Sequence, residues 1–433
     1  MQLSSWGRYP ILDAEIDLPA NTTTAAASLR AHAPLIAYGV GRSYGDSALA
    51  PRVLDTRRLD LLLAFDPATG LLRAQAGVTL DEVLKVFVPK GWFLRITPGT
   101  KYVTVGGAIA SDVHGKSHHV DGCFSEALED FKLMLADGSV VTCSRSQNAE
   151  LFRATCGGMG LTGVILEAGF KLQPIQSASF DQTTYKCANL EEVLARLDET
   201  RHVRYAVAWI DCVTQGAGLG RSVLTVGDHA TEGPLRPHGE PLLTVPIVAP
   251  DWVVSPWTIK AFNALIYHKT LAKKSLARVH YNPFFYPLDI ASHWNRLYGK
   301  AGFTQYQFVI PKAAGPAGLR QILLRIAASQ MGSGLAVVKT TGPQNDNPLS
   351  FPLEGYTLAL DFKIQAQLFP LLDDLDAMVQ AYGGRIYLTK DVRLNEKNFK
   401  QSYPRWREFQ AVREKVGAIG RFASLQSKRL GLD

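Results

Sequence analysis

The side chains best suited to acid–base chemistry gather in one stretch, residues 97–119 (TPGTKYVTVGGAIASDVHGKSHH). His114, Lys116, His118 and His119 follow a run of very small residues there. An imidazole, or an amine with a lowered pKa, can take up a proton near neutral pH. Small residues let a planar or phosphate-bearing ligand approach the backbone closely. The stretch therefore predicts a ligand site, and a structural histidine loop is the alternative.

A metal site is the other chemistry that these histidines suggest. His114 and His118 stand four residues apart, which suits two ligands on one helical face. Gly115 and the turn-rich residues before it argue against a helix, and no carboxylate or cysteine cluster lies nearby. We therefore expect no metal.

Two more glycine-rich segments flank this stretch, residues 37–47 (AYGVGRSYGDS) and 156–165 (CGGMGLTGVI). The first follows a predicted strand at 35–38, and its glycines allow backbone N–H groups to converge on a pyrophosphate. Its spacing is not G-x-G-x-x-G, and no helical periodicity follows, so a nicotinamide-binding Rossmann fold is disfavoured. The alternatives are an ordinary glycine turn for the first segment and a helix C-cap for the second.

Hydrophobic periodicity indicates the elements that position these segments. Strands are predicted at 35–38, 71–76, 161–170, 204–211, 305–310 and 335–338, a hairpin at 131–142, and helices at 79–88, 319–328 and 405–416. The fold class is α+β. Three parts are expected, a first domain (1–177), a β-rich second domain (178–384) and a C-terminal segment (385–433) that packs back on the first.

Composition narrows the functional classes. The chain has 433 residues, a net charge of +7 and no long Lys/Arg run, which favours phosphate-bearing substrates or a membrane surface over nucleic acid. Its five cysteines form no C-x-x-C pair, so a reducing compartment is expected. The N-terminal residues predict no signal peptide, and no stretch is apolar for long enough to span a bilayer.

The three glycine-rich segments, in this order, give the chain a specific resemblance. GRSYGD, PGTKYVTVGGAIASDVHGKSHH and CGGMGLTGVI resemble the FAD domain of the vanillyl-alcohol-oxidase (PCMH-type) family, and within it the decaprenylphosphoryl-β-D-ribose 2-oxidases. The likeness continues through PLDIASHWNRLYG, VVKTTGP and YGGRIYLTKDVR and so covers nearly the whole chain. It implies a FAD-binding domain of two α+β subdomains and a substrate domain with an antiparallel sheet flanked by helices.

The resemblance also implies a set of cofactor contacts. The residues expected to bind FAD are Ala37, Tyr38, Gly39, Val40, Gly41, Arg42, Ser43, Tyr44, Gly45, Asp46, Ser47, Gly99, Thr104, Val105, Gly106, Gly107, Ser111, Asp112, Val113, His114, Ile165 and Tyr387. Asp46 stands where relatives with covalent flavin carry a histidine, and the context of Cys123 does not match a second anchor. Noncovalent FAD is therefore expected.

The resemblance places the reaction between the two domains. Lys390, Lys339 and His114 are the expected catalytic residues, and Tyr44 and Lys116 are expected to bind substrate. Gln305 and Gln307 stand two apart on a predicted strand, so they face one side and can bind hydroxyl groups. The alternative for each lysine is a solvated surface charge.

Two positions depart from the family pattern. Mycobacterial members carry a cysteine in the strand that matches residues 356–362, where this chain has Ala359. The tyrosine expected before the PLD motif is Phe285 here, with Tyr286 displaced by one position. These departures predict a differently shaped pocket.

The activity implied is oxidation of the 2-hydroxyl of a polyprenyl-phosphoryl pentose to a keto sugar, the first half of an epimerisation to the arabinose form used in the cell envelope. A short-chain reductase partner and a quinone-like electron acceptor follow from the same resemblance. One alternative is an alditol or aldonolactone oxidase that uses oxygen. The other is a basic binding protein without catalysis, whose affinity would fall steeply with salt.

One apolar segment leaves two interpretations open. Residues 241–269 include Trp252, Trp257, Phe262 and Tyr267 and form either packed core or a lid over a polyprenyl tail. The lid would bring a cytoplasmic protein into peripheral contact with the inner membrane.

Overall fold

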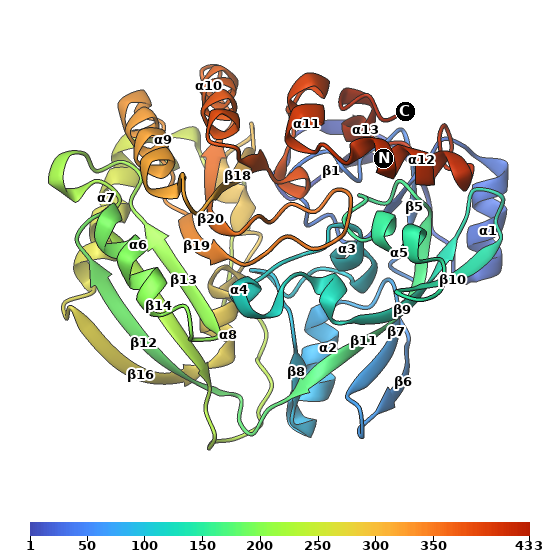
Figure 1. The fold of residues 1–433 in the computed structure, drawn as a ribbon, viewed down its shortest axis with the longest axis horizontal. Helices are drawn as coiled ribbons and strands as arrows, with labels where there is room; N and C mark the ends of the chain where they lie inside the picture. The colour runs from blue at the N-terminus through green and yellow to red at the C-terminus, as the bar shows by residue number, and fades with distance from the viewer.

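The computed structural model describes residues 1–433 and has an α+β fold (Figure 1). The chain begins with the hairpin β1 (Gln2–Ser4) and β2 (Ile11–Asp13). A parallel sheet follows in the order β3 (Glu15–Asp17), β5 (Arg52–Asp55) and β4 (Ile36–Tyr38). Helix α1 (Thr22–Ala31) packs its Leu29 with Leu35 and Leu54 of this unit. The small sheet fixes the start of the glycine loop that leaves β4.

A six-stranded antiparallel sheet forms the second unit. Its order is β10 (Val140–Ser144), β9 (Leu128–Met134), β11 (Val164–Pro174), β7 (Leu71–Gln75) and β6 (Leu62–Asp66), and β8 (Trp92–Leu94) pairs with the end of β11. Helices α2 (Leu80–Phe87) and α3 (Val105–Ala110) share one apolar core with it. Four further short helices complete the unit: η1 (Val88–Lys90), α4 (His118–Asp121), η2 (Phe124–Glu126) and α5 (Ala149–Thr155).

An eight-stranded antiparallel sheet dominates the rest of the molecule (Figure 1). Its order is β16 (Lys274–His280), β12 (Ser179–Cys187), β14 (Ser222–His229), β13 (Tyr205–Ile210), β19 (Ala336–Thr341), β20 (Gly355–Lys363), β18 (Phe303–Pro311) and β21 (Arg385–Ile386). Helices α6 (Leu190–Glu199), α9 (Gly315–Ser329) and α10 (Leu368–Ala381) cover one face. Alternate residues along each strand point to the other face, which is left to the functional site.

Several short elements lie around this sheet. They are η3 (Gly216–Gly218), β15 (Leu243–Thr244), η4 (Asp251–Val253), α7 (Pro256–Lys269), α8 (Tyr281–Phe285), η5 (Pro287–Ile290), β17 (Ala291–Ser292) and η6 (Trp294–Tyr298). None of the helices combines the length and apolar character that a bilayer-spanning segment needs.

The C-terminal segment runs back over the N-terminal units (Figure 1). It contains η7 (Leu388–Lys390), α11 (Glu396–Ser402), α12 (Trp406–Lys415) and α13 (Leu425–Arg429). Phe422 forms a β-bridge with Leu35, and the buried guanidinium of Arg413 donates to the carbonyl of Leu161. The domain bounds predicted from the sequence remain a prediction, although no strand crosses between the two large sheets.

Most predicted elements are present, with α2, the β9–β10 hairpin and α9 close to their expected positions. The core interpretation of residues 241–269 is wrong. Asn263 is the only buried residue of α7, and Trp252 and Trp257 are 70% and 81% exposed.

Arg429 fastens the C-terminal helix to the glycine loop, since its guanidinium pairs with the buried carboxylates of Asp46 (2.6 Å) and Asp391 (2.8 Å). Arg429→Met leaves two buried carboxylates without a counter-charge and should lower the free energy of unfolding by about 3–5 kcal/mol. Urea denaturation measures the loss. Lys415→Ala, which removes an exposed ion pair with Glu150, is the control and should cost less than about 1 kcal/mol. Equal losses in the two variants would contradict this account of Arg429.

Candidate functional site

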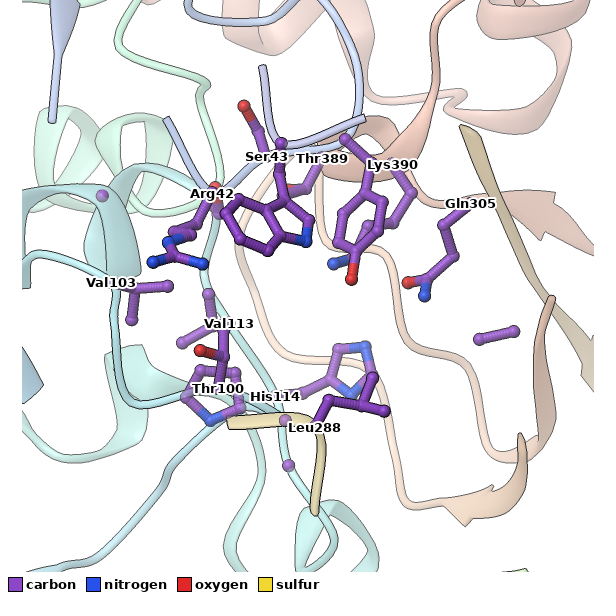
Figure 2. A pocket seen from close by; sticks show the side chains of 18 of the residues that line it. Arg42, Ser43, Thr100, Val103, Val113, His114, Leu288, Gln305, Thr389 and Lys390 are labelled. Atoms are coloured by element: carbon purple, nitrogen blue, oxygen red, sulfur yellow. The ribbon is translucent and has the colours of Figure 1, made fainter. Parts of the chain in front are cut away.

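A cavity of about 700 Å³ lies between the N-terminal units and the uncovered face of the eight-stranded sheet. Its walls come from the loop after β4, the α3 region, β11 and strands β13, β14, β18, β19 and β20. In Figure 2, Lys390, Gln305 and His114 surround one part of this space, and Arg42 lies at its other side. A cavity of this size suits a cofactor together with part of a substrate.

The loop after β4 presents a row of free hydrogen-bond donors. The five consecutive backbone N–H groups of residues 39–43 donate no hydrogen bond to any protein atom. All five residues line the cavity, and Gly41 has a φ of +64°, which a residue with a side chain rarely adopts. Such a series of N–H groups forms a concave anion site. These residues fit a dinucleotide pyrophosphate.

The glycine-rich segment at residues 97–119 provides room for a ligand and does not provide free N–H groups. The N–H groups of Val105, Gly106 and Gly107 already donate to the carbonyls of Val78 and Ala76 and to the Thr104 hydroxyl. A Cβ atom at Gly99 would meet no atom within 4 Å, and one at Gly107 would meet only the Thr104 hydroxyl, at 3.0 Å. The missing side chains leave room for a bulky ring system. When bound, FAD would supply the hydride acceptor.

Most of the predicted cofactor contacts line the cavity. Those that do are Ala37, Tyr38, Gly39, Val40, Gly41, Arg42, Ser43, Tyr44, Ser47, Gly99, Thr104, Gly106, Gly107, Ser111, Val113, His114, Ile165 and Tyr387.

Four predicted contacts point elsewhere. Gly45 packs against the backbone of residue 391, and Asp46 pairs with Arg429. Val105 is buried in the apolar core that α3 shares with the six-stranded sheet, and Asp112 accepts hydrogen bonds from Ser125, Asn345 and Asn347. In both loops alternate or neighbouring residues face opposite ways, so a motif counted along the sequence includes residues that only support the loop.

The three predicted site lysines meet in the cavity. Burial lowers the pKa of Lys390 and of Lys116 to about 7 and that of Lys339 to about 8. Lys116 donates to the carbonyl of Phe285 (2.8 Å), and the Lys390 ammonium lies 4.0 Å from the centre of the Tyr44 ring. None of the three forms an ion pair with a carboxylate. They are therefore available to an anionic ligand and can exchange protons near neutral pH.

His114 and the two glutamines also face the cavity. The Gln307 side chain lies 3.2 Å from the imidazole of His114, and Gln305 donates to Asp361 (2.6 Å). Burial, followed by the positive charge of Lys339, holds the pKa of His114 well below its usual range. His114 is therefore neutral, and its unpartnered Nδ1 atom is free for a ligand.

His118 and His119, the other two histidines of residues 97–119, have structural roles. His118 Nδ1 accepts a hydrogen bond from the N–H of Gly342, and His119 bonds to the carbonyl of Val203. Neither lines the cavity. No group of three or more His, Cys, Asp and Glu side chains lies close enough to hold a metal ion.

The two departures from the family pattern have different consequences. Ala359 lines the cavity, so its small side chain leaves space beside Asp361 on the same face of β20. Phe285 and Tyr286 are fully buried outside the cavity lining, and the Tyr286 hydroxyl bonds to Thr97 (2.7 Å).

Sequence reasoning missed Asp361, Asp289 and Trp209, which all line the cavity. Asp361 stands two residues after Ala359 in an apolar strand, and strand alternation alone would have placed both on one face. Asp289 is held by Lys101 and Thr100. The isolated carboxylate in YTLALDF was the available signal.

The role of residues 39–43, called the donor loop below, in binding FAD can be tested at Gly41. In Gly41→Ala the positive φ becomes strained and the new Cβ would clash with the Tyr38 hydroxyl, so the loop and the Tyr38 side chain must rearrange. FAD affinity, measured by titration of the apoprotein, should fall at least about tenfold, since each lost charge-assisted hydrogen bond is worth about 1.5–3 kcal/mol. Gly216→Ala has a similar φ of +66° with open space around it and should keep normal affinity. The account fails if both variants bind FAD equally well.

Comparison with known proteins gives a consistent result. A family model described as a FAD binding domain matches residues 18–144. The decaprenylphosphoryl-beta-D-ribose oxidase of Mycolicibacterium smegmatis is 35% identical over 100% of this chain and 97% of its own. The L-gulonolactone oxidase of Bos taurus is 23% identical over 89% of this chain and 86% of its own. The human Delta(24)-sterol reductase is 32% identical, over only 26% of this chain and 22% of its own.

The full-length match and the cavity agree on the type of protein. The matched residues 18–144 include the donor loop and the glycines of the 97–119 segment, and both line the cavity. The resemblance inferred from the glycine-rich motifs is thereby confirmed. The chain belongs to the decaprenylphosphoryl-β-D-ribose oxidase family of FAD-linked oxidases and is a FAD-dependent oxidoreductase.

Proposed function

We propose that this protein oxidises the 2-hydroxyl of a polyprenyl-phosphoryl pentose of the decaprenylphosphoryl-ribose type to a keto sugar. This step is the first half of an epimerisation to the arabinose form. The observation that carries the proposal is the meeting of Lys116, Lys339 and Lys390 in the cavity that contains the donor loop. A sugar that carries a phosphodiester needs positive charge at one end and a proton acceptor at the other.

Lys390 is the proposed catalytic base. Its side chain is half-buried and forms no ion pair, and at neutral pH a large fraction of its amine is uncharged because its pKa is about 7. A neutral amine can accept the hydroxyl proton while the carbon gives up hydride. Lys339 and Lys116 are proposed to hold the phosphate, and His114, Tyr44, Gln305 and Gln307 to orient the sugar.

The lipid tail has an apolar path beneath α7. Val207, Trp209 and Val223 line the cavity from β13 and β14, and Phe262 and Ile266 line it from α7. The outer side of this segment exposes Trp257 (81%) and Leu265 (65%) beside Lys269, Lys273 and Lys274. We propose that α7 is a lid over the tail and that it brings a cytoplasmic protein to the surface of the inner membrane.

FAD is proposed to be noncovalent, because neither Asp46 nor Cys123 lines the cavity. Release of all flavin into the supernatant after acid precipitation is the expected result. A quinone-like acceptor and a short-chain reductase complete the proposed reaction sequence. Membership in a family of FAD-linked oxidases argues against a binding protein without catalysis.

The substrate class is tested by steady-state oxidation of decaprenylphosphoryl-ribose, free ribose and L-gulonolactone, each with a quinone and with oxygen as acceptor. The proposal predicts efficient turnover of the lipid-linked sugar with the quinone. Preferential turnover of free sugars or lactones with oxygen would identify an aldonolactone-type oxidase instead.

The role of the base is tested by Lys390→Met, which keeps the side-chain volume and removes the amine. We expect kcat to fall about 10²–10⁴-fold while FAD stays bound, since general-base catalysis contributes that much. In the wild-type enzyme kcat/KM should rise with pH through about 7, because only the deprotonated amine accepts a proton. A wild-type profile that is flat across neutral pH, or a variant with normal kcat, would exclude this role.

The tail path is tested with two neighbouring residues of α7. Ile266→Asp places a charge in the cavity wall, and Leu265→Asp places one in solvent. With detergent-solubilised substrate, Ile266→Asp should raise KM at least about tenfold for a decaprenyl tail, because an unpaired charge is costly in an apolar path. It should leave KM for a short-tailed analogue unchanged, and Leu265→Asp should change neither. Equal effects on both tail lengths would place the tail elsewhere.

A further inference from the structure

Asp361 lines the cavity, and the proposed function gives it no role. It lies on β20 with its side chain toward the cavity and is 2% exposed. Gln305 donates to one carboxylate oxygen at 2.6 Å, and the backbone N–H of Asp361 donates to Ser333 at 3.0 Å. The other oxygen, Oδ2, has no hydrogen-bond partner in the protein. The carboxylate is therefore held firmly with one acceptor unused.

A buried acceptor without a donor is destabilising, and more so when it is charged. In a cavity wall the missing donor is expected from the ligand. A carboxylate only accepts hydrogen bonds and repels a phosphate, so the matching ligand group is a sugar hydroxyl. The phosphate then belongs at the other side of the pentose, toward Lys116 and Lys339. Asp361 thus distinguishes the two ends of the substrate.

Several ionisable groups surround Asp361. Lys390 approaches from η7, Tyr44 from the loop after β4 and Tyr298 from η6. Lys339 and His114 face Lys390 from farther away. Lys390 is too far away for an ion pair, yet the Asp361 charge raises its pKa against the effect of burial. Burial raises the pKa of Asp361 itself to about 7. The two groups therefore influence one another across the space that a hydroxyl can occupy.

We propose that Asp361 is a substrate-binding carboxylate that works with Lys390. Its unpartnered oxygen accepts a hydrogen bond from a sugar hydroxyl, and its negative charge favours the charged form of the Lys390 amine. This inference rests on the proposed function for the identity of the sugar. The electrostatic part does not depend on the identity of the sugar.

Competitive acetylation of the FAD-loaded protein without substrate tests the electrostatic part. Acetic anhydride reacts with neutral amines, so the pH dependence of labelling, followed by mass spectrometry of each lysine peptide, reports the titration of Lys390 and Lys339. In Asp361→Asn the Lys390 midpoint should fall by about one pH unit or more, because a nearby negative charge is lost. The Lys339 midpoint should stay unchanged, since Asp361 does not contribute to its pKa. An unmoved Lys390, or an equal shift of both lysines, would overturn the inference.

Substrate kinetics test the hydrogen bond. The amide variant retains the bond from Gln305 but turns a donor toward the sugar, so KM should rise about 10–100-fold. The ascending limb of its kcat/KM profile should also move to lower pH, an effect that a purely structural residue would not produce. A KM and profile identical to the wild type would remove Asp361 from the site.

Two results separate this inference from the proposed function. If the wild-type enzyme oxidises no lipid-linked pentose, the proposed function fails, and the labelling experiment still decides whether Asp361 controls Lys390. If the amide variant does not retain FAD or a normal unfolding transition, Asp361→Ser, which removes the charge with a smaller side chain, is labelled in its place.

Discussion

The alternation of side chains along the eight-stranded sheet is the constraint on which the rest of the structure depends. On β13, Ala206, Ala208 and Ile210 pack beneath the helices, while Val207 and Trp209 face the cavity. The same holds on β18, where Tyr306 and Phe308 are core and Gln305 and Gln307 are not. A register shift of one residue would bury the polar set and expose the core. The eight-stranded sheet therefore packs against the helices with one face and lines the site with the other.

This arrangement allows a dense cluster of ionisable groups in a buried place. Lys116, Lys339 and Lys390 share the cavity with His114 and Asp361, and burial favours the uncharged form of each of these side chains. The supporting contacts come from the other side of the sheet and from the C-terminal segment. Tyr44, for example, is fixed by its N–H bond to the carbonyl of Thr389, beside Lys390. An anionic cofactor and an anionic substrate supply the charge that such a site lacks.

Local patterns predicted the parts of the site that depend on local geometry. The glycine loop after β4 and the pair Gln305 and Gln307 follow from strand position and alternation, and the cavity contains them. The roles of Lys339 and Lys390 came from resemblance, and the structure places both in the cavity without testing those roles. Gly45 and Val105 were included because a motif does not show which residues face inward.

Other features depend on contacts between distant residues and could not be predicted. The pairing of Asp46 with Arg429 joins residues 383 positions apart. Whether residues 241–269 are core or surface depends on whether other elements cover them. Helix α7 directs Phe262 and Ile266 toward the cavity, while Trp257 is exposed. Composition is the same for a core segment and for an exposed lid, so only the tertiary structure distinguishes them.

The central claim is that the donor loop and the 97–119 segment hold FAD against the uncovered face of the eight-stranded sheet, and that the 2-hydroxyl of a lipid-linked pentose is oxidised there. Anaerobic flavin reduction by decaprenylphosphoryl-ribose carrying deuterium at C2 or at C3 tests it most directly. The account predicts that bleaching of the flavin absorption is slower with the C2 label and unchanged with the C3 label. Slowing by the C3 label alone, or no bleaching with either substrate, would contradict it.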